Sequence, residues 1–371
     1  MRKRRSEKWA VYPPDVLPAF VAETDFPVAP AVRSSLDAAL DCGDTGYAWP
    51  GAVAPAFAGF ARRRFGWQPA VESIFEVPDV MAGVAQALQV LTEPGGGVII
   101  NPPVYAPFFE TIRTSQRRCV EVPLLRGPDG RWDLDFEGLE HAFAAGAQAY
   151  LLCSPHNPVG RVWKRAQIEQ IAQLTARYNV AVIADEIHAP LTMPGIEFTP
   201  FLGGSGRTRS VSLISASKAW NIAGLKCGVL TASADIAAAV KARLRSIPTE
   251  IEARVGHLGA LATAAAFEHG ATWLDEECAH LQKNALLLES LLRERIPAAR
   301  FIQPEATYLA WIDCSALGIA GEPAEYFLRH GRVALERGSK FGTGGAQHVR
   351  LNFGTSGAIL REIVERMARA G

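Results

Sequence analysis

Short apolar runs alternate with amphipathic segments through the middle of this chain. The apolar runs span residues 97–100, 119–122, 149–153, 180–184 and 210–215, and apolar residues at helical spacing mark 106–115, 134–145 and 165–178. Short strands that alternate with helices form parallel sheets with crossover helices. The pattern predicts an α/β fold with a mostly parallel sheet between helices, in which ligands lie beyond the carboxyl ends of the strands.

The two ends of the chain differ from this middle part. Prolines crowd the residues before Pro30, which predicts an extended arm, and residues 30–40 continue as a helix. Beyond Gly228 the pattern turns helical, over residues 235–246, 252–268 and 273–296, and alternating strand patterns return at 307–313 and 348–353. These segments indicate a second unit with both helices and strands.

Length and composition allow two cores. The chain has 371 residues, of which 49% are hydrophobic, whereas one domain usually takes about 150 residues. We expect a large α/β domain over residues 45–272 and a smaller α+β domain formed by residues 1–44 and 273–371.

Charge and cysteine usage exclude several classes of partner. Lysine plus arginine and aspartate plus glutamate each number 38, so no overall field attracts nucleic acid or an anionic membrane. No apolar run approaches the roughly 18 residues of a membrane span, and the basic residues at the start are typical of a solvated tail. Six scattered cysteines form no metal-like spacing with histidine. We expect a cytoplasmic protein with reduced cysteines, no metal and a small-molecule partner.

One lysine, Lys218, lies in a loop of hydroxyls, glycines and a second cation at residues 215–228. The loop directly follows the apolar run 210–215, which holds it rigidly. A lysine placed there loses water around its ammonium, so its pKa falls and its amine becomes nucleophilic near neutral pH. We therefore predict that Lys218 is the catalytic lysine and carries an aldehyde cofactor as a Schiff base. An ordinary surface loop is the alternative.

Groups around Lys218 suit a phosphate carried on that aldehyde. Ser215 and Ser217 offer hydroxyls, and Lys226 offers a positive charge eight positions after Lys218. The combination points to pyridoxal phosphate (PLP) as the cofactor.

A second phosphate contact is expected at the helical segment 80–91, which begins with small residues. Backbone N–H groups at a helix start bind phosphate, and a glycine lets the ligand approach closely. We predict that Gly83 and Val84 bind the cofactor there. Many helices begin with small residues, so this signal is weak by itself.

Asp185 directly follows the apolar run 180–184. A buried carboxylate at that strand end can pair with a protonated pyridine nitrogen and keep the ring an electron sink; a helix N-cap is the alternative. His188 either bonds the phenolate oxygen of the cofactor or is a packed histidine.

Two further strand ends carry candidate ligand contacts. Prolines and a glycine hold an irregular backbone at 154–160, which can aim Asn157 at a ligand. Tyr105 follows the run 97–100 and can stack on a pyridine ring, although a core tyrosine would show the same pattern.

These motifs resemble those of the aminotransferase-like, fold-type-I PLP enzymes of class I and II. The lysine loop matches S-x-S-K followed by glycine, a basic residue and glycine, and residues 157–160 match N-P-x-G. The resemblance implies that Asn157 bonds the phenolate oxygen and also meets the substrate, and that Tyr47 reaches a cofactor phosphate across a homodimer interface. It also implies that Arg350 grips the substrate α-carboxylate, although a lone strand arginine is usually a surface residue.

Within that superfamily the chain resembles most the cystathionine β-lyase branch, also called MalY/PatB-like. The matching segments are Lys8-Trp9, residues 22–27 with Ala22 expected at the substrate, Pro155 to Trp163, Asp185 to His188, and the Lys218 loop. Thr24 stands where the branch has methionine near the substrate mouth, and Lys226 stands where many relatives have arginine. Thr24 bears on which substrate side chain is preferred. Lys226 replaces the forked phosphate contact of an arginine by a point charge.

The resemblance implies a PLP-dependent carbon–sulfur β-lyase. Such an enzyme eliminates a thiol from L-cystathionine or another cysteine S-conjugate and leaves pyruvate and ammonia. Two alternatives stay open: an aminotransferase with the same cofactor apparatus, and a catalytically weak regulatory relative. Direct DNA binding is not expected, because no helix-turn-helix or basic recognition element is visible.

Overall fold

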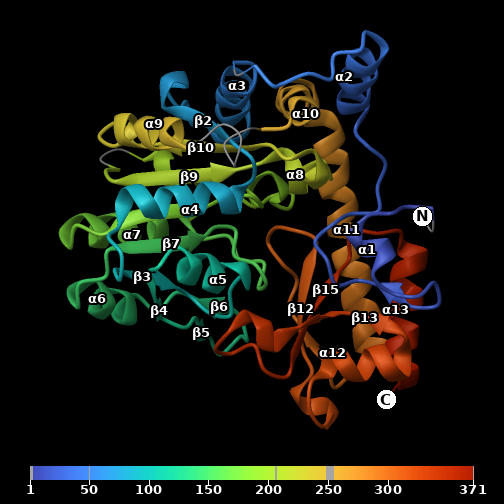
Figure 1. Cartoon of the computed structure of the whole chain (residues 1–371). Helices are drawn as coiled ribbons and strands as arrows, with labels where there is room; N and C mark the ends of the chain where they lie inside the picture. The colour runs from blue at the N-terminus through green and yellow to red at the C-terminus, as the bar shows by residue number, and fades with distance from the viewer. Residues whose placement is uncertain (1–2, 50, 205–206, 248–254, 371) are drawn as a thin grey trace.

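The computed structural model describes residues 3–49, 51–204, 207–247 and 255–370. Within these residues the chain forms a seven-stranded sheet and a four-stranded sheet, together with two short strand pairs (Figure 1). The start of the basic tail, at residues 1–2, and the beginning of the helical segment before residue 255 lie outside the described residues.

The large sheet has the strand order β2-β10-β9-β8-β7-β3-β4. Its strands β9, β8, β7, β3 and β4 run parallel, whereas β10 is antiparallel to both of its neighbours. The strands are β2 (Ile74–Val77), β3 (Gly97–Ile100), β4 (Arg118–Glu121), β7 (Ala149–Cys153), β8 (Ala181–Asp185), β9 (Ser210–Ile214) and β10 (Gly228–Ala232). The predicted α/β fold with a mostly parallel sheet is confirmed.

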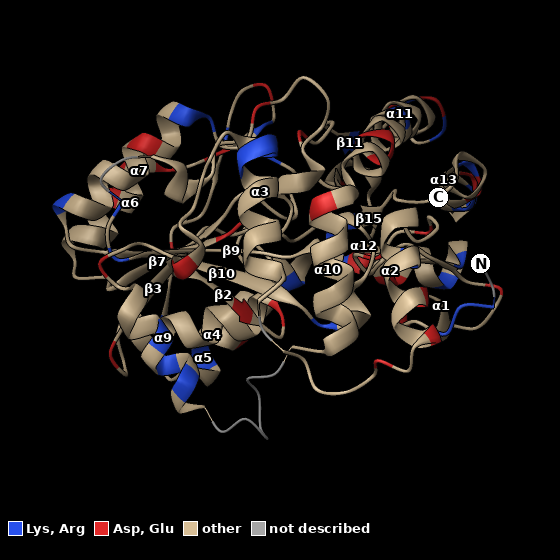
Figure 2. Cartoon of the chain, turned by 90° about the horizontal axis from the view of Figure 1, so that it is seen from above, with Lys and Arg blue, Asp and Glu red and all other residues tan. Residues whose placement is uncertain are grey.

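Helices cover both faces of this sheet because successive strand residues point to opposite sides. Ile100 and Leu151 pack with helices α4 (Val80–Leu91), α5 (Pro107–Thr114) and α9 (Ala237–Ser246). Ile99 and Leu152 pack with α6 (Phe136–Ala144) and α7 (Arg165–Arg177) on the other face. Figure 2 shows these two groups of helices on opposite sides of the strands.

A third core joins the large sheet to the C-terminal part of the chain. Its helices are α3 (Val53–Phe65), α8 (Ala216–Ala219), α10 (His257–His269), the long α11 (Ala271–Arg295), α12 (Pro323–Tyr326) and α13 (Gly357–Ala370). The four-stranded sheet has the order β11-β12-β15-β14, with strands β11 (Arg300–Phe301), β12 (Leu309–Asp313), β14 (Glu336–Arg337) and β15 (His348–Asn352). A hairpin of β5 (Leu125–Arg126) and β6 (Trp132–Asp133) lies at the edge of the large sheet.

The N-terminal arm crosses to this C-terminal part. It contains α1 (Glu7–Ala10) and β1 (Leu17–Pro18), and β1 pairs in parallel with β13 (Val333–Ala334). Figure 1 accordingly places the blue start of the chain beside the red end.

One strand was not predicted. Residues Gly228–Ala232 form the strand β10, in which Val229 and Leu230 are buried on opposite faces of the sheet; so short an apolar run does not distinguish strand from helix. The helices expected beyond it are present as α9, α10 and α11. Helix α2 (Pro30–Asp41) packs against α10, with Val32 and Ala39 buried, and the domain limits stay a prediction.

No described helix has the length and apolar character that crossing a membrane requires.

Candidate active site

Ten of the thirteen predicted site residues line one cavity of about 460 Å³. The cavity lies beyond the carboxyl ends of β7, β8 and β9 and reaches the strand β15, and its volume suits a small ligand. The ten residues are Ala22, Tyr105, Asn157, Asp185, His188, Ser215, Ser217, Lys218, Lys226 and Arg350.

Lys218 lies on the one-turn helix α8, directly after β9. Ser215 caps this turn, since its hydroxyl oxygen accepts a hydrogen bond from the Ser217 N–H at 3.0 Å and its proton goes to the Cys227 carbonyl at 2.6 Å. The Lys218 Nζ donates to the Ala22 carbonyl at 2.9 Å. Burial, and then the nearby Arg350 cation, lower the pKa of Lys218 to about 8. The amine is therefore far easier to deprotonate than an exposed lysine.

Asp185 is the last residue of β8 and is buried at the cavity floor. Its Oδ1 accepts a hydrogen bond from the Ile187 N–H at 3.1 Å, and no cation among the described residues lies within ion-pair distance. Burial raises the pKa of Asp185 to about 7. A positively charged ligand group beside this carboxylate would restore its ionised form.

His188 lies near Asp185, buried and with no hydrogen-bond partner for its Nδ1 in the described chain. Burial, followed by Lys218 and Arg350, lowers the pKa of His188 to about 3, so the imidazole is neutral. A neutral histidine that lines the cavity can donate or accept one hydrogen bond from a ligand.

Asn157 and Arg350 meet at the side of the cavity that faces β15. The Arg350 Nη1 donates to the Asn157 Oδ1 at 3.2 Å, and its Nη2 donates to the Phe20 carbonyl at 2.9 Å. The guanidinium stacks over the Phe341 ring at 5.1 Å, and its Nε has no partner among the described residues. Arg350 is thus a buried cation with donor capacity to spare, which suits a carboxylate.

Lys226 and the start of α4 also line the cavity. Lys226 forms an ion pair with Asp79 at 2.8 Å, and Asp79 caps α4 by accepting from the Ala82 N–H at 2.8 Å. Burial acts to raise the pKa of Asp79, but these hydrogen bonds outweigh it and the pKa is lowered. Val80 and Met81 line the cavity beside this pair.

Gly83 and Val84 do not reach the cavity, which corrects their expected role. The Gly83 N–H already donates to the Asp79 carbonyl inside the helix, and a Cβ at Gly83 would lie 2.2 Å from a Leu213 methyl carbon. This glycine lets α4 approach β9 closely, and Val84 is buried in the same core. The N–H groups with no helical partner lie at the first helical residues, so the expectation was placed about one turn too late.

Tyr47 also lies outside the cavity of its own chain. Its side chain is 85% exposed in the segment before α3, beside Trp49 at 89%. Its predicted contact with a second subunit stays a prediction. Thr24, expected at the substrate mouth, is buried and does not line the cavity, while Ala22 does.

Sequence reasoning missed several residues of the cavity wall. Asp79 could have been found as the N-cap that precedes the helix at 80. Glu7, Cys153, Glu336, Lys340 and Phe341 also line the cavity, and no local pattern marks them.

The donor set fits PLP. A buried carboxylate that pairs with no described cation, a neutral histidine and an amide line the cavity with a lysine of lowered pKa, and a second cation and a helix start line it too. The carboxylate suits a ring nitrogen, and the histidine and the amide suit a phenolate. The lysine suits an aldehyde, and the cation with the helix start suits a phosphate. On this fold, such a site defines an enzyme of the fold-type-I PLP class.

The comparisons agree with that class. The family model for aminotransferase class I and II matches residues 54–367, so the chain belongs to this family. A relative from Mycobacterium leprae (strain TN), a cystathionine beta-lyase by name, is 43% identical over 389 residues, covering 99% of this chain and 95% of the relative. Cystathionine beta-lyase PatB of Bacillus subtilis (strain 168) is 36% identical over 96% of this chain and 92% of its own length.

Solved structures show the same fold. Cystalysin from Treponema denticola, whose structure contains PLP, superposes with a TM-score of 0.92 at 29% identity, covering 100% of this chain and 96% of cystalysin. The expected cystathionine β-lyase branch of the family is confirmed.

The lowered pKa of Lys218 predicts how the cofactor-free enzyme captures PLP. Only the neutral amine attacks an aldehyde, so the rate constant should rise with pH and level off above about pH 8. An ordinary lysine would keep gaining neutral amine up to about pH 10.4. Stopped-flow absorbance at several pH values measures this profile, and a rate that still climbs steeply above pH 9 would contradict the assignment.

The Asp79–Lys226 pair predicts a gain in cofactor affinity on neutralising Asp79. Asp79→Asn keeps the helix cap, because asparagine is an equally good N-cap residue, but removes a negative charge beside the expected phosphate site. We expect the dissociation constant of PLP to fall by about threefold, since half-exposed charges are worth up to about 1 kcal/mol. Lys226→Ala should raise the dissociation constant of PLP instead. Fluorescence titration of the cofactor-free enzyme measures both, and weaker binding by Asp79→Asn would contradict the assignment.

Proposed function

We propose that this chain is a PLP-dependent carbon–sulfur β-lyase that acts on L-cystathionine or other cysteine S-conjugates. With L-cystathionine and water the products are homocysteine, pyruvate and ammonia. One observation carries the proposal: Lys218 and Arg350 line the same cavity as the buried Asp185. Relatives named cystathionine beta-lyase, similar over nearly the whole chain, support the choice of substrate class.

Each group of this chain has a defined task in that reaction. When bound, PLP supplies a ring that takes up the electrons left as the substrate Cα loses its proton. Asp185 holds the ring nitrogen in its protonated form, because the buried carboxylate is stabilised by that positive charge. Asn157 and His188 supply hydrogen bonds to the ring oxygen, and Tyr105 packs against the ring.

Lys218 moves the proton. Its amine takes the proton from Cα and returns it to the departing sulfur, which leaves as a thiol once the Cβ–S bond breaks. Arg350 holds the α-carboxylate, and this fixes which bond at Cα faces Lys218. A thiolate is a better leaving group than an alkoxide because its conjugate acid has the lower pKa, so elimination is favoured when sulfur is on Cβ.

The runner-up is an aminotransferase, which uses the same residues up to the loss of the Cα proton. Cystathionine incubated with the PLP-loaded enzyme distinguishes the two. Thiol and pyruvate released in equal amounts without any added keto acid support the lyase. Amino transfer that requires a keto acid, with no thiol released, would establish the aminotransferase, and neither reaction would favour the regulatory relative.

The enzyme acts as a homodimer with shared sites, in which Tyr47 contacts the cofactor phosphate of the neighbouring subunit. The exposed aromatic pair Tyr47 and Trp49, which a neighbouring subunit would cover, supports this arrangement. Action in the cytoplasm is supported by the cysteines, all six of which are described and free.

Mixed dimers test whether the two subunits share their active sites. A Tyr47→Phe chain is combined with a Lys218→Ala chain, and the mixed species is purified by two different tags. If Tyr47 crosses the interface, both defects fall in one site, and the site that keeps Lys218 has wild-type kinetics. If the mixed dimer turns over substrate with the Tyr47→Phe defect, Tyr47 does not reach the active site of the neighbouring subunit.

A further inference from the structure

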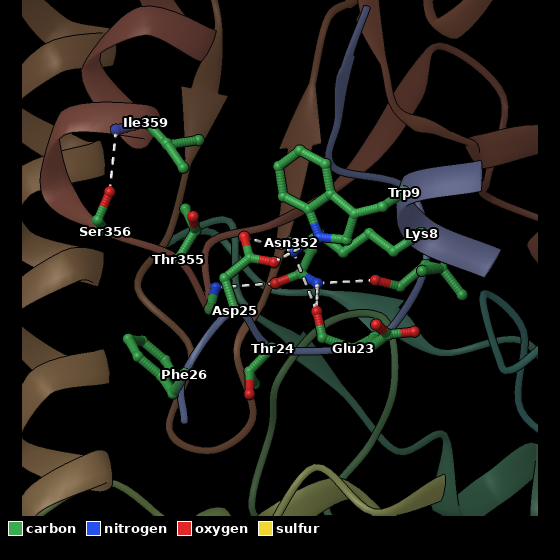
Figure 3. A network of polar contacts seen from close by, with 12 residues as sticks. Lys8, Trp9, Glu23, Thr24, Asp25, Phe26, Asn352, Thr355, Ser356 and Ile359 are labelled. Carbon is green, nitrogen blue, oxygen red and sulfur yellow. Dashed lines mark hydrogen bonds and ion pairs between the residues drawn. The ribbon is translucent and has the colours of Figure 1, made fainter. Parts of the chain in front are cut away.

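The N-terminal arm contains an ion pair that the proposed chemistry does not use. The Lys8 Nζ lies 2.9 Å from the Asp25 Oδ2, and both side chains are only 1% exposed. The Trp9 Nε1 donates to the Asp25 Oδ1 at 2.9 Å, and Lys8 also donates to the Glu23 carbonyl at 3.1 Å. Figure 3 shows these groups converging where α1 crosses the segment 23–26. The pair thus folds the start of the arm back onto its later part.

That later part supplies carbonyl groups to the active site. The Ala22 carbonyl accepts from the Lys218 Nζ at 2.9 Å and from the Tyr308 hydroxyl at 3.1 Å, and the Phe20 carbonyl accepts from Arg350 at 2.9 Å. The main chain at residues 20–22 therefore contacts both the amine that moves the proton and the cation that meets the carboxylate.

Further hydrogen bonds connect the arm to the elements that carry these two residues. Thr24 and Asn221, three residues after Lys218, exchange two hydrogen bonds, at 3.0 Å and 2.9 Å. Asn352, two residues after Arg350, donates to the carbonyls of Val21 and Glu23, both at 2.7 Å (Figure 3). The segment 20–25 is thus bonded on one side to the lysine loop and on the other to β15.

We propose that Lys8 and Asp25, with Trp9, are positioning residues that hold the segment 20–25 between Lys218 and Arg350, so that the arm sets the spacing of these two groups. Lys8 and Asp25 do not touch the reacting atoms; they act through the main chain of residues 20–24. This inference rests on the proposed function for the roles of Lys218 and Arg350.

Burial explains why this pair can hold the segment. A buried ion pair is a weak source of net stability, but loss of one partner leaves an uncompensated charge that must regain water. Without Lys8, Asp25 keeps Arg4 as its cation, whose Nη1 lies 3.8 Å from the Asp25 Oδ1 and whose side chain is 32% exposed. This longer, partly solvated contact compensates the buried charge less well, so the segment 20–25 should shift toward water. Removal of Lys8 should therefore displace the carbonyls of Phe20 and Ala22.

The test compares Lys8→Met, Trp9→Phe and the double variant Lys8→Met/Asp25→Asn in the PLP-loaded enzyme. Two quantities are measured: amide deuterium exchange over residues 19–26, and the dissociation constant of L-alanine from the change in cofactor absorbance on rapid mixing. L-Alanine has no leaving group at Cβ, so neither quantity depends on carbon–sulfur cleavage, and an aminotransferase would give the same result. Asp15→Asn is the control, because Asp15 belongs to the same arm but pairs with Arg332 at the exposed surface.

We expect faster exchange over 19–26 in Lys8→Met and L-alanine binding weaker by about 10- to 100-fold, as small misplacements of binding groups cost this much. The double variant should recover part of both losses, since the Asp25→Asn change removes the charge and leaves an oxygen that still accepts the Trp9 hydrogen bond. Trp9→Phe should show a smaller effect in the same direction, and it keeps the test valid if Lys8→Met does not fold. A lower melting temperature with unchanged exchange and unchanged L-alanine binding would reduce the pair to a structural role and overturn the proposal.

Discussion

Replacing Lys218 by alanine is expected to lower kcat with L-cystathionine by about four orders of magnitude or more. A positioned proton-transfer group alone contributes about 10²- to 10⁴-fold, and Lys218 has the additional role of holding the cofactor aldehyde. The variant should still fold, since a smaller side chain at this cavity wall leaves the Ser215 cap of α8 in place. Steady-state assay of pyruvate release measures the loss.

Peptide mapping tests whether the cofactor is attached to Lys218 itself. Borohydride reduction of the wild-type enzyme should attach the cofactor to the peptide that contains Lys218, and the alanine variant should carry no label there. Lys283→Ala, at an exposed position of α11, serves as the matched control and should keep wild-type turnover. A cofactor attached to any other lysine would refute the assignment.

Replacing Arg350 by alanine is expected to lower kcat/KM by about 10²- to 10³-fold, mainly through a higher KM. Loss of one partner of a buried charge pair costs about 2–5 kcal/mol, and each 1.4 kcal/mol is about tenfold in affinity. Arg350→Lys should recover little, because lysine lacks the planar fork that suits a carboxylate. The cofactor should stay bound, since Lys218, Asp185 and Lys226 are left unchanged in the cavity.

The measurement is a comparison of KM and kcat with the absorbance of bound PLP. Arg337→Ala, on the neighbouring strand β14 and half-exposed, is the matched control. An Arg350→Ala enzyme that loses kcat but keeps KM would show that the arginine acts on the chemistry and not on carboxylate binding.

The residues that sequence reasoning located best are those at strand ends. Asp185, Asn157 and Lys218 each follow an apolar run, and parallel strands place their carboxyl ends along one edge of the sheet. The fold class followed from the same pattern, because alternating strands and helices allow few other arrangements.

The residues that were misplaced depend on contacts that leave no local signal. Gly83 in α4 is small because Leu213, on the strand β9, needs the space. Thr24 is buried because the arm binds Asn221, almost two hundred residues away in sequence. Lys8 and Asp25 were identified only as parts of matching motifs, since no local sequence pattern indicates that either residue has a buried partner. The strand β10 was missed because its apolar run is short.

The parallel pairing of β1 with β13 has a consequence for synthesis. Leu17 and Pro18 pair with Val333 and Ala334, more than three hundred residues later. A ribosome adds about 5–20 residues per second, so the arm waits some tens of seconds for its partner strand. The Ala22 carbonyl that meets Lys218 is thus made long before the strand that pairs with its arm. A nascent chain can complete its large sheet once residue 232 has emerged, but its active site is finished only after β13 and β15 have also been made.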